Sequence, residues 1–227
     1  EIPGQPAREL AGHERARVRL DAVLPVDVAV VADVAHFEEV LARLLEAVDE
    51  ATVVAAADPD DADGDGISGR PNRVLDTNGA TVLGRFGWKA NVATVEDQNA
   101  GAFHGDIGIT TKLHPDQECT DVQAACRAAP TGGSPEVDDQ KLERITFYTR
   151  TLAVPARRAV GEPDTDGGET LFTDLGCASC HLPELRTGSS TIVPQLADQL
   201  IHPYTDLLVH DMGPDLADDR PDFEAAG

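Results

Sequence analysis

The sequence predicts a mainly α protein with little β structure. Apolar residues at positions 34, 37, 40, 41, 44, 45 and 48 recur at the spacing of one helix face, so residues 34–48 are expected to form an amphipathic helix. A second stripe of this kind runs through Leu142, Ile145, Tyr148 and Leu152. The alternation of apolar and polar residues that is typical of a half-buried strand is scarce along the chain.

Between the two stripes the chain is rich in loop-forming residues. Residues 58–65 are an Asp-rich loop, and residues 70–117 are dense in Gly and Asn, with one helix expected near residues 95–103. The helix that carries the second stripe is predicted to begin at Ser134 and Pro135, which are typical of an N-cap and a first helical residue. It is predicted to stop before Pro155.

After the second stripe, residues 155–165 are expected to form a linker. A short helix over residues 167–175, capped by Thr165 or Asp166, then leads into a cysteine pair, and residues 183–227 are expected to be mostly loop. The linker divides the chain into two predicted domains, 1–154 and 155–227.

Acidic residues outnumber basic residues by 41 to 18 in the 227-residue chain, which gives a net charge of −23. Such a surface repels nucleic acid and anionic lipid, so neither is an expected partner. It attracts a basic redox partner or metal cations, although an adaptation to solubility would give the same balance. No stretch approaches the roughly 20 apolar residues that a membrane span needs.

Cys177, Cys180 and His181 form the Cys-x-x-Cys-His pattern of c-type haem attachment. Two thiols three positions apart at a helix end can add across the two vinyl groups of one haem, and the adjacent imidazole then faces the iron. The rival interpretations are a redox dithiol, a zinc site and a buried disulfide. A redox dithiol would follow a strand in a βαβ unit, which is not predicted, and the further zinc ligands on offer, His202 and His210, are poorly spaced.

The residues around this motif resemble those of cytochrome c domains. An aromatic residue, Phe172, and a glycine, Gly176, precede the cysteines, and Pro183 follows the histidine. The carbonyl of Pro183 is expected to accept the second N–H of the His181 ring, which would fix the orientation of that ring. We therefore expect residues 155–227 to form a cytochrome c-like domain with one covalent haem c.

Three residues compete for the sixth position on the haem iron. Met212 is the only methionine in the chain and lies 31 residues after His181. A thioether would raise the haem potential, whereas His202 or His210 would give a lower one. We expect Met212 as the ligand, with His202 and His210 as the alternatives.

The Asp-rich loop is a candidate calcium site. Asp61, Asp63 and Asp65 alternate as in an EF-hand loop, and Ile67 would offer its backbone carbonyl. Crowded carboxylates are costly unless a cation neutralises them. The bidentate Glu of such loops is replaced by Asn72, so either Asn72, Asp76 or a more distant residue completes the shell, or calcium binds weakly. A solvated acidic turn is the alternative.

Cys119 and Cys126 form the other cysteine pair. We expect a disulfide between them, which suits an oxidising compartment and would stabilise the fold by roughly 2.5 kcal/mol in the loop-entropy model. A free reactive pair is the alternative.

Longer stretches extend the resemblance well beyond the haem motif. They are residues 63–72, 83–90, 105–110, 152–158, 176–181 and 203–213. In this order they are similar to the bacterial di-haem oxidoreductase family, whose members are often labelled thiol oxidoreductases and are relatives of the di-haem cytochrome c peroxidases. Members of the family have two haem motifs, whereas this sequence contains one, so we expect a partial or divergent member.

The resemblance implies roles for three further residues. In the peroxidase relatives a Trp between the haems relays electrons, and a Gln ten residues later lines the distal side of the peroxidatic haem. Trp88 and Gln98 have this spacing, and Asp106 is implied as a nearby acid. Ordinary core packing is the alternative for Trp88. The peroxidase relatives also bind calcium between their domains, which supports the calcium prediction.

We therefore expect a periplasmic or otherwise exported c-type haem oxidoreductase. In the intact family member, electron transfer would be coupled to peroxidase-like chemistry at a second haem, with Arg85 or Lys89 near the haem propionates. The alternative is a non-catalytic electron carrier or docking module of a larger redox complex. A calcium-stabilised scaffold without haem is a third possibility.

Overall fold

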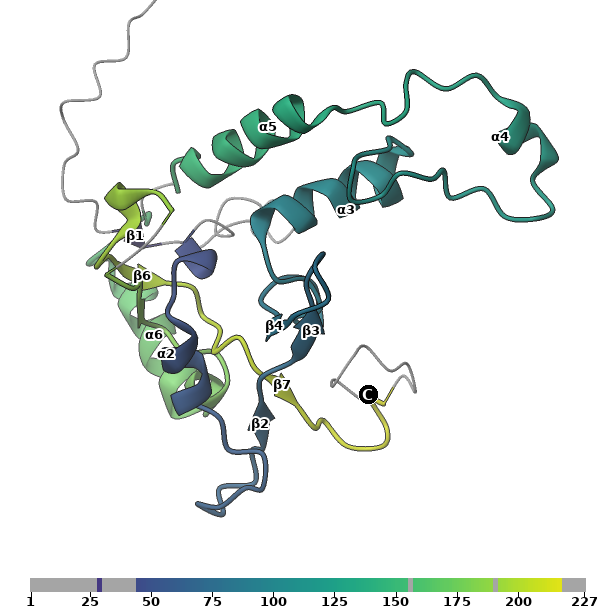
Figure 1. Ribbon diagram of the computed structural model, residues 1–227. Coiled ribbons are helices and arrows are strands. Elements are labelled where there is room, and N and C mark those ends of the chain that lie inside the picture. Colours follow the sequence, from purple (N-terminus) through teal and green to yellow (C-terminus); the bar gives the residue numbers. More distant parts are fainter. Residues whose placement is uncertain (1–27, 30–43, 155–156, 190–191, 218–227) are drawn as a thin grey trace, which may run out of the picture.

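The computed structural model describes residues 28–29, 44–154, 157–189 and 192–217 of the chain (Figure 1). Most of the helix predicted over residues 34–48 lies outside the described residues. Its last part, residues 44–46, is helical.

Helices account for most of the regular structure, and the strands are short. The helices are α2 (Glu50–Ala55), α3 (Val95–Ile107), α4 (Ala124–Ala128), α5 (Asp139–Thr151) and α6 (Pro163–Asp174), with 3₁₀ turns η1 (Cys177–Ser179) and η2 (Pro194–Leu196). The strands are β1 (Val28–Ala29), β2 (Gly69–Arg70), β3 (Arg73–Leu75), β4 (Thr81–Leu83), β5 (Leu185–Arg186), β6 (Leu200–His202) and β7 (Val209–His210). This agrees with the predicted mainly α fold. In the described part of the chain, no helix has the length and apolar character needed to cross a membrane.

The short strands join segments that are far apart in the sequence. β6 lies between β1, to which it is parallel, and β5, to which it is antiparallel. β2 pairs with β7 in antiparallel register, with Gly69 opposite His210, and β3 and β4 form a hairpin. Strand pairs therefore connect residues on both sides of position 155.

Helix α3 begins and ends at local sequence features. The hydroxyl of Thr94 accepts a hydrogen bond from the backbone N–H of Asp97 at 3.1 Å, which satisfies one of the free N–H groups of the first turn. Gly108 ends the helix in a left-handed conformation, with φ of 66°. The helix predicted near residues 95–103 is therefore confirmed and extends for about one turn farther.

The predicted start of α5 at Ser134 is wrong. Asp138 is the N-cap, and its carboxylate accepts from the N–H of Lys141 at 2.8 Å. The residues just before Asp138 bond to a distant segment instead of joining the helix. The carboxylate of Glu136 accepts from the N–H of Thr110 at 3.0 Å, and this contact holds the residues around Glu136 outside α5.

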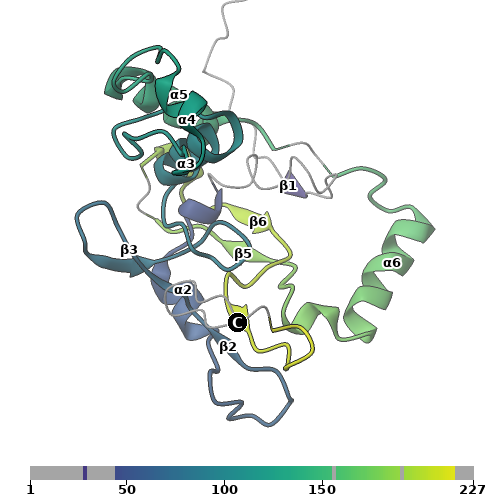
Figure 2. The ribbon, with the colours of Figure 1, turned by 90° about the vertical axis from the view of Figure 1, so that its right-hand side faces the viewer.

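The predicted start of the helix before the cysteine pair is also wrong. Helix α6 begins at Pro163, four residues earlier than expected, and not after a Thr165 or Asp166 cap. Proline is favoured at the first helical position, and the carboxylates of Asp164 and Asp166 in the first turn interact favourably with the helix dipole. Figure 2 shows α6 at one side of the molecule.

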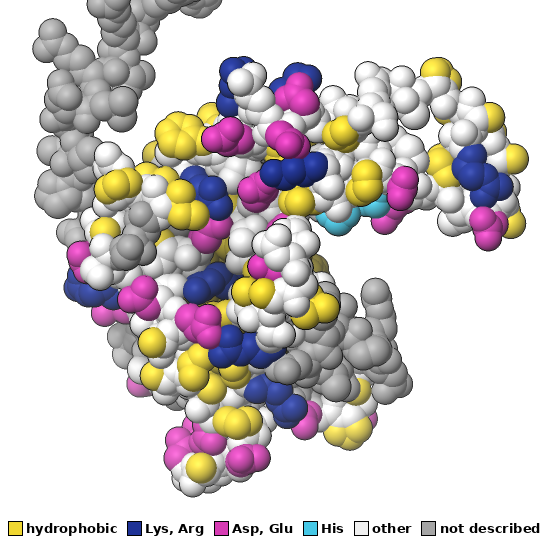
Figure 3. Space-filling model, in the orientation of Figure 1, with side chains coloured by type: hydrophobic (Ala, Val, Ile, Leu, Met, Phe, Trp, Pro, Cys, Tyr) yellow, Lys and Arg dark blue, Asp and Glu magenta, His cyan; other side chains and the backbone are white. Residues whose placement is uncertain are grey.

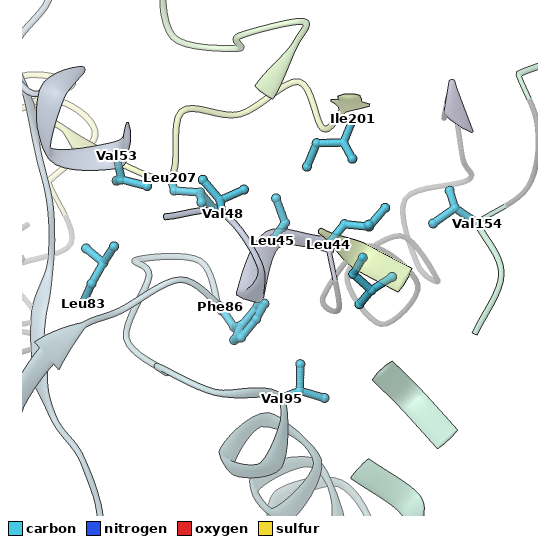
Figure 4. Close-up of a cluster of buried hydrophobic side chains, with 11 residues drawn as sticks. Leu44, Leu45, Val48, Val53, Leu83, Phe86, Val95, Val154, Ile201 and Leu207 are labelled. Carbon is cyan, nitrogen blue, oxygen red and sulfur yellow. The ribbon is translucent and has the colours of Figure 1, made fainter. Parts of the chain in front are cut away.

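The hydrophobic core draws on four parts of the chain (Figure 4). Its buried members are Leu44, Leu45, Val48, Val53, Leu83, Phe86, Val95, Val154, Leu196, Ile201 and Leu207. Full burial of such a side chain stabilises the fold by about 1.5–3 kcal/mol relative to its exposure. The core therefore fixes the C-terminal strands against the segment that precedes α2.

The carboxylate of Glu46 links this core to α3 and α5. It accepts from the backbone N–H of Val95 at 2.9 Å, at the start of α3. It also accepts from Nε and Nη2 of Arg150, near the end of α5, at 2.7 and 2.8 Å. The hydrogen bond to Glu46 raises the pKa of Arg150. The two helices lie side by side in both views (Figures 1 and 2).

The segment between α3 and α5 projects from the body and carries α4 (Figure 1). Cys119 and Cys126 form a disulfide there, with Cα atoms 5.7 Å apart. The predicted pairing of these cysteines is confirmed, and the disulfide closes the loop that leads into α4.

We predict that Glu46→Ala lowers the free energy of unfolding by about 3 kcal/mol, because it leaves the mostly buried Arg150 guanidinium without its charged partner. Urea denaturation followed by circular dichroism measures this. Lys112→Ala is the control, since its ion pair with Glu96 is exposed and is worth less than about 1 kcal/mol. Equal losses in the two variants would contradict the prediction.

Candidate haem site

A cavity of about 830 Å³ lies beside the cysteine motif. This volume falls within the range of about 300–1,000 Å³ that is usual for cofactor pockets. The lining includes the motif residues Cys177, Cys180 and His181, together with Arg70, Trp88 and Lys89 and several residues between positions 205 and 217. The cavity therefore brings the predicted attachment residues together with three segments that are remote in the sequence.

The local backbone explains how the motif faces the cavity. Helix α6 is followed by Gly176, which has φ of 80°, a conformation that glycine adopts without steric cost. The turn η1 follows at once, and the N–H of His181 donates to the carbonyl of Cys177 at 3.0 Å. Both Cys177 and Cys180 are half-buried and are not joined in a disulfide. The site thus has two thiols and an imidazole at one compact turn, as haem attachment requires.

The imidazole of His181 is held in an orientation that suits an iron ligand. Its Nδ1 lies 3.0 Å from the carbonyl oxygen of Tyr204, which can only accept, so Nδ1 carries the hydrogen and Nε2 keeps its lone pair. The ring of Phe172 meets that of His181 edge-on at 6.3 Å between centroids, and meets that of Tyr204 at 5.3 Å. A backbone carbonyl on the second nitrogen is the usual way of orienting a metal-bound histidine.

The expected partner of His181 was the carbonyl of Pro183, and this expectation is wrong. That carbonyl lies 3.1 Å from Nδ1 of His202 on β6. The register of β5 and β6 brings Pro183 to His202, while Tyr204, with φ of 52°, supplies the carbonyl for His181.

The structure separates the three candidates for the sixth iron position. Both ring nitrogens of His210 are engaged: Nδ1 lies 2.9 Å from the carbonyl of Ser68, and Nε2 lies 2.8 Å from the carboxylate of Asp206. His202 is not among the residues that line the cavity. Met212 lines the cavity, and 66% of its surface is exposed, so its thioether is accessible.

Trp88 is fully exposed and lines the cavity, which excludes core packing as its role. Lys89 and Arg70 also line the cavity. Arg85, the other expected propionate partner, lies instead at a second cavity of about 210 Å³ beside Glu46, where burial lowers its pKa. Sequence reasoning missed Arg70, whose place at the cavity depends on the pairing of β2 with β7.

Gln98 and Asp106 both lie on α3, away from the cavity lining. The side chain of Gln98 is half-buried, and that of Asp106 is exposed. Their roles therefore remain predictions that involve a second haem.

The acidic loop between α2 and β2 forms the lowest tip in Figures 1 and 3, where carboxylates gather. Oxygens of Asp58, Asp61 and Asp63 lie within 4.8 Å of one another. The carboxylate of Asp65 instead accepts from the N–H of Ile67 at 2.8 Å. The structure thus groups two of the three predicted carboxylates with Asp58, which had not been predicted.

Asn72, which stands at the twelfth position of the loop, does not turn towards these carboxylates. It is buried, and its Nδ2 donates to the backbone carbonyl of Lys89 at 2.9 Å. It therefore fixes the segment around Lys89 at the cavity.

The model of the family described as "Di-haem oxidoreductase, putative peroxidase" matches residues 27–227 of the chain. The matched range includes the cysteine motif and every residue of the cavity lining. Comparisons with curated proteins and with solved structures found no match.

We predict slow alkylation of Cys180 in the haem-free folded protein near pH 8. Burial, and then the charges of Asp206 and Asp65, raise the pKa of this thiol, which lowers the fraction of reactive thiolate. Peptide mass mapping after iodoacetamide treatment should show slower labelling than in urea, with a deficit that shrinks as the pH rises through the raised pKa.

Asp65→Asn removes one of these charges and should speed up the labelling of Cys180 in the folded protein. Cys119 and Cys126 should stay unlabelled until their disulfide is reduced. Labelling of Cys180 that is as fast in the folded protein as in urea at every pH would contradict the prediction.

Proposed function

Because the chain belongs to the di-haem oxidoreductase family, we propose that it is a periplasmic c-type haem oxidoreductase with a haem attached to Cys177 and Cys180. The observation that carries the proposal is the 830 Å³ cavity, which both thiols and the imidazole of His181 line. A bound haem would supply one-electron redox chemistry. Residues 155–227 would form a cytochrome c-like unit around it.

The proximal side of the site would be formed by His181. Its Nε2 is the nitrogen left for the iron, because Nδ1 donates to the carbonyl of Tyr204. That hydrogen bond makes the imidazole a stronger electron donor and fixes its rotation. Phe172 meets both rings edge-on and so supports the orientation of His181.

Met212 is the proposed sixth ligand. It lines the cavity with an accessible side chain, whereas both nitrogens of His210 are engaged and His202 lies outside the lining. A thioether in this position raises the reduction potential relative to a second histidine, which suits an electron-accepting haem.

The basic residues of the lining, Arg70 and Lys89, would neutralise the haem propionates. Trp88 would pass electrons to a second haem in the intact family member, because its indole is exposed beside the cavity. Gln98 and Asp106 would act at that second haem, where peroxide or another oxidant is reduced. This sequence contains one Cys-x-x-Cys-His motif, so the second haem would come from another segment.

A non-catalytic electron carrier is the second candidate function. A Met212-ligated haem has no open iron position, and the net charge of −23 would attract a basic redox partner. The site of this chain alone supports the carrier role as well as it supports the electron-accepting half of a di-haem enzyme.

We also propose a structural calcium ion at the acidic loop. The carboxylates of Asp58, Asp61 and Asp63 lie within reach of one cation, and calcium takes such oxygen ligands. Asp65 and the carbonyl of Ile67 are the further donors that the sequence offers in this loop.

The chain produced together with c-type maturation machinery should carry one haem per molecule in a pyridine haemochrome assay, and its mass should rise by one haem. The Cys177→Ser and Cys180→Ser double variant should hold no covalent haem, because it lacks both thioether bonds. The Cys119→Ser and Cys126→Ser double variant is the matched control and should keep its haem. Absence of covalent haem in the parent chain would refute the proposed function.

Peroxide separates the two candidate functions. A carrier with both axial positions filled should keep its absorption spectrum when hydrogen peroxide is added in the presence of a reducing partner. Peroxide turnover that appears only when a second haem-bearing segment is supplied would favour the enzyme, and a Trp88→Ala variant should then turn over more slowly.

Calcium at about one hundred times its dissociation constant should stabilise the chain by about 2.7 kcal/mol, which raises the melting temperature by about 5 °C. Asp61→Asn should abolish this rise, because it removes one carboxylate of the cluster. Asp60→Asn is the matched control, since Asp60 lies in the same loop but outside the cluster. Equal calcium responses in the two variants would refute the site.

A further inference from the structure

Among the residues that the structure describes, the segment that carries Met212 has few anchors of its own. Beyond β7, residues 211–213 have no regular structure, and Met212 is 66% exposed. The backbone N–H groups of Gly213 and Leu216 bond within the segment, to the Asp211 side chain and the Gly213 carbonyl. The position of Met212 at the cavity therefore depends on what holds β7.

His210, two residues before Met212, is held from two sides. Its Nδ1 lies 2.9 Å from the carbonyl of Ser68, just before β2, and its Nε2 lies 2.8 Å from the carboxylate of Asp206. Asp206 is itself buried, and its other oxygen accepts from the N–H of Leu208 at 2.9 Å. The ring thus connects two segments that are 142 residues apart in the chain.

Gly69 lets the ring of His210 approach β2 closely. A Cβ atom at this position would lie 3.0 Å from Cε1 of His210 and 2.9 Å from Cδ1 of Leu208. Such distances are shorter than ordinary van der Waals contact, so a larger residue would displace the side chains of Leu208 and His210. A glycine at position 69 therefore allows His210 to pack closely against β2.

We propose that His210 is a positioning residue, which fixes β7 against β2 and so holds Met212 in place to ligate the haem iron. This proposal rests on the proposed haem and on Met212 as its ligand. The two hydrogen bonds order the segment before the thioether binds, so that less conformational entropy is lost when it does. Because both nitrogens serve this purpose, His210 is not itself a ligand.

The test uses the haem-loaded chain and imidazole as an external ligand that competes with the thioether for ferric iron. His210→Leu removes both hydrogen bonds and should strengthen the apparent affinity for imidazole about tenfold, the effect expected for lost hydrogen bonds of this kind. The far-red absorption band of methionine-ligated ferric haem should weaken in parallel.

Two conservative variants separate positioning from ligation. His210→Asn keeps an N–H donor near the place of Nδ1, and His210→Gln keeps one near the place of Nε2, so each should show an intermediate imidazole affinity. If His210 were an iron ligand, all three substitutions would remove that ligand equally. Gly69→Ala should shift the affinity in the same direction as His210→Leu without changing His210, and it serves as the second probe if His210→Leu does not fold.

His202→Leu is the matched control, because His202 also bonds a backbone carbonyl but lies outside the cavity lining. It should leave the imidazole titration unchanged. The proposal is overturned if His210→Leu and Gly69→Ala titrate like the parent chain. An unchanged titration in Met212→Leu would overturn both the methionine ligand and the positioning role, whereas absence of haem from the parent would refute the proposed function itself.

Discussion

The packing of α3 and α5 against the core depends on the carboxylate of Glu46. This one group binds the first turn of α3 through the N–H of Val95 and the last turn of α5 through the guanidinium of Arg150. It sits among core residues of the same segment, such as Leu44 and Leu45. Because a carboxylate with this little exposure is stable only when its charge and hydrogen bonds are satisfied, the two helices can pack on the core in few ways.

The same core positions the cavity beside the cysteine motif. Ile201 and Leu207 belong to the buried cluster, and between them lies Tyr204, whose carbonyl meets His181. The cavity is thus assembled from segments that are far apart in the sequence, and strand pairs such as β2 with β7 bring them together. A division of the chain at position 155 remains a prediction, although the pairs β1–β6 and β2–β7 both connect residues across it.

The sequence predicts best those features whose chemistry is local. The motif of Cys177, Cys180 and His181 was predictable because bond lengths and helix geometry fix the spacing of its residues. Helix α3 was predictable because local features, such as the Thr94 N-cap, mark where it begins. The carbonyl partner of His181 was not, because the register of two-residue and three-residue strands leaves no periodic pattern. Arg70 was missed for the same reason: its place at the cavity follows from the pairing of β2 with β7, which the sequence pattern does not reveal.

The exposure of Trp88 is explained by the cavity that it lines. An indole buries roughly 150–250 Å² when it is covered, which at about 25 cal/mol per Å² corresponds to several kcal/mol. Here the indole is fully exposed beside a cavity that two basic side chains also line. A haem bound in that cavity would cover part of the indole, in an electron carrier and in a di-haem enzyme alike. Trp88 is therefore better explained as a residue of the proposed haem site than as a misplaced core residue.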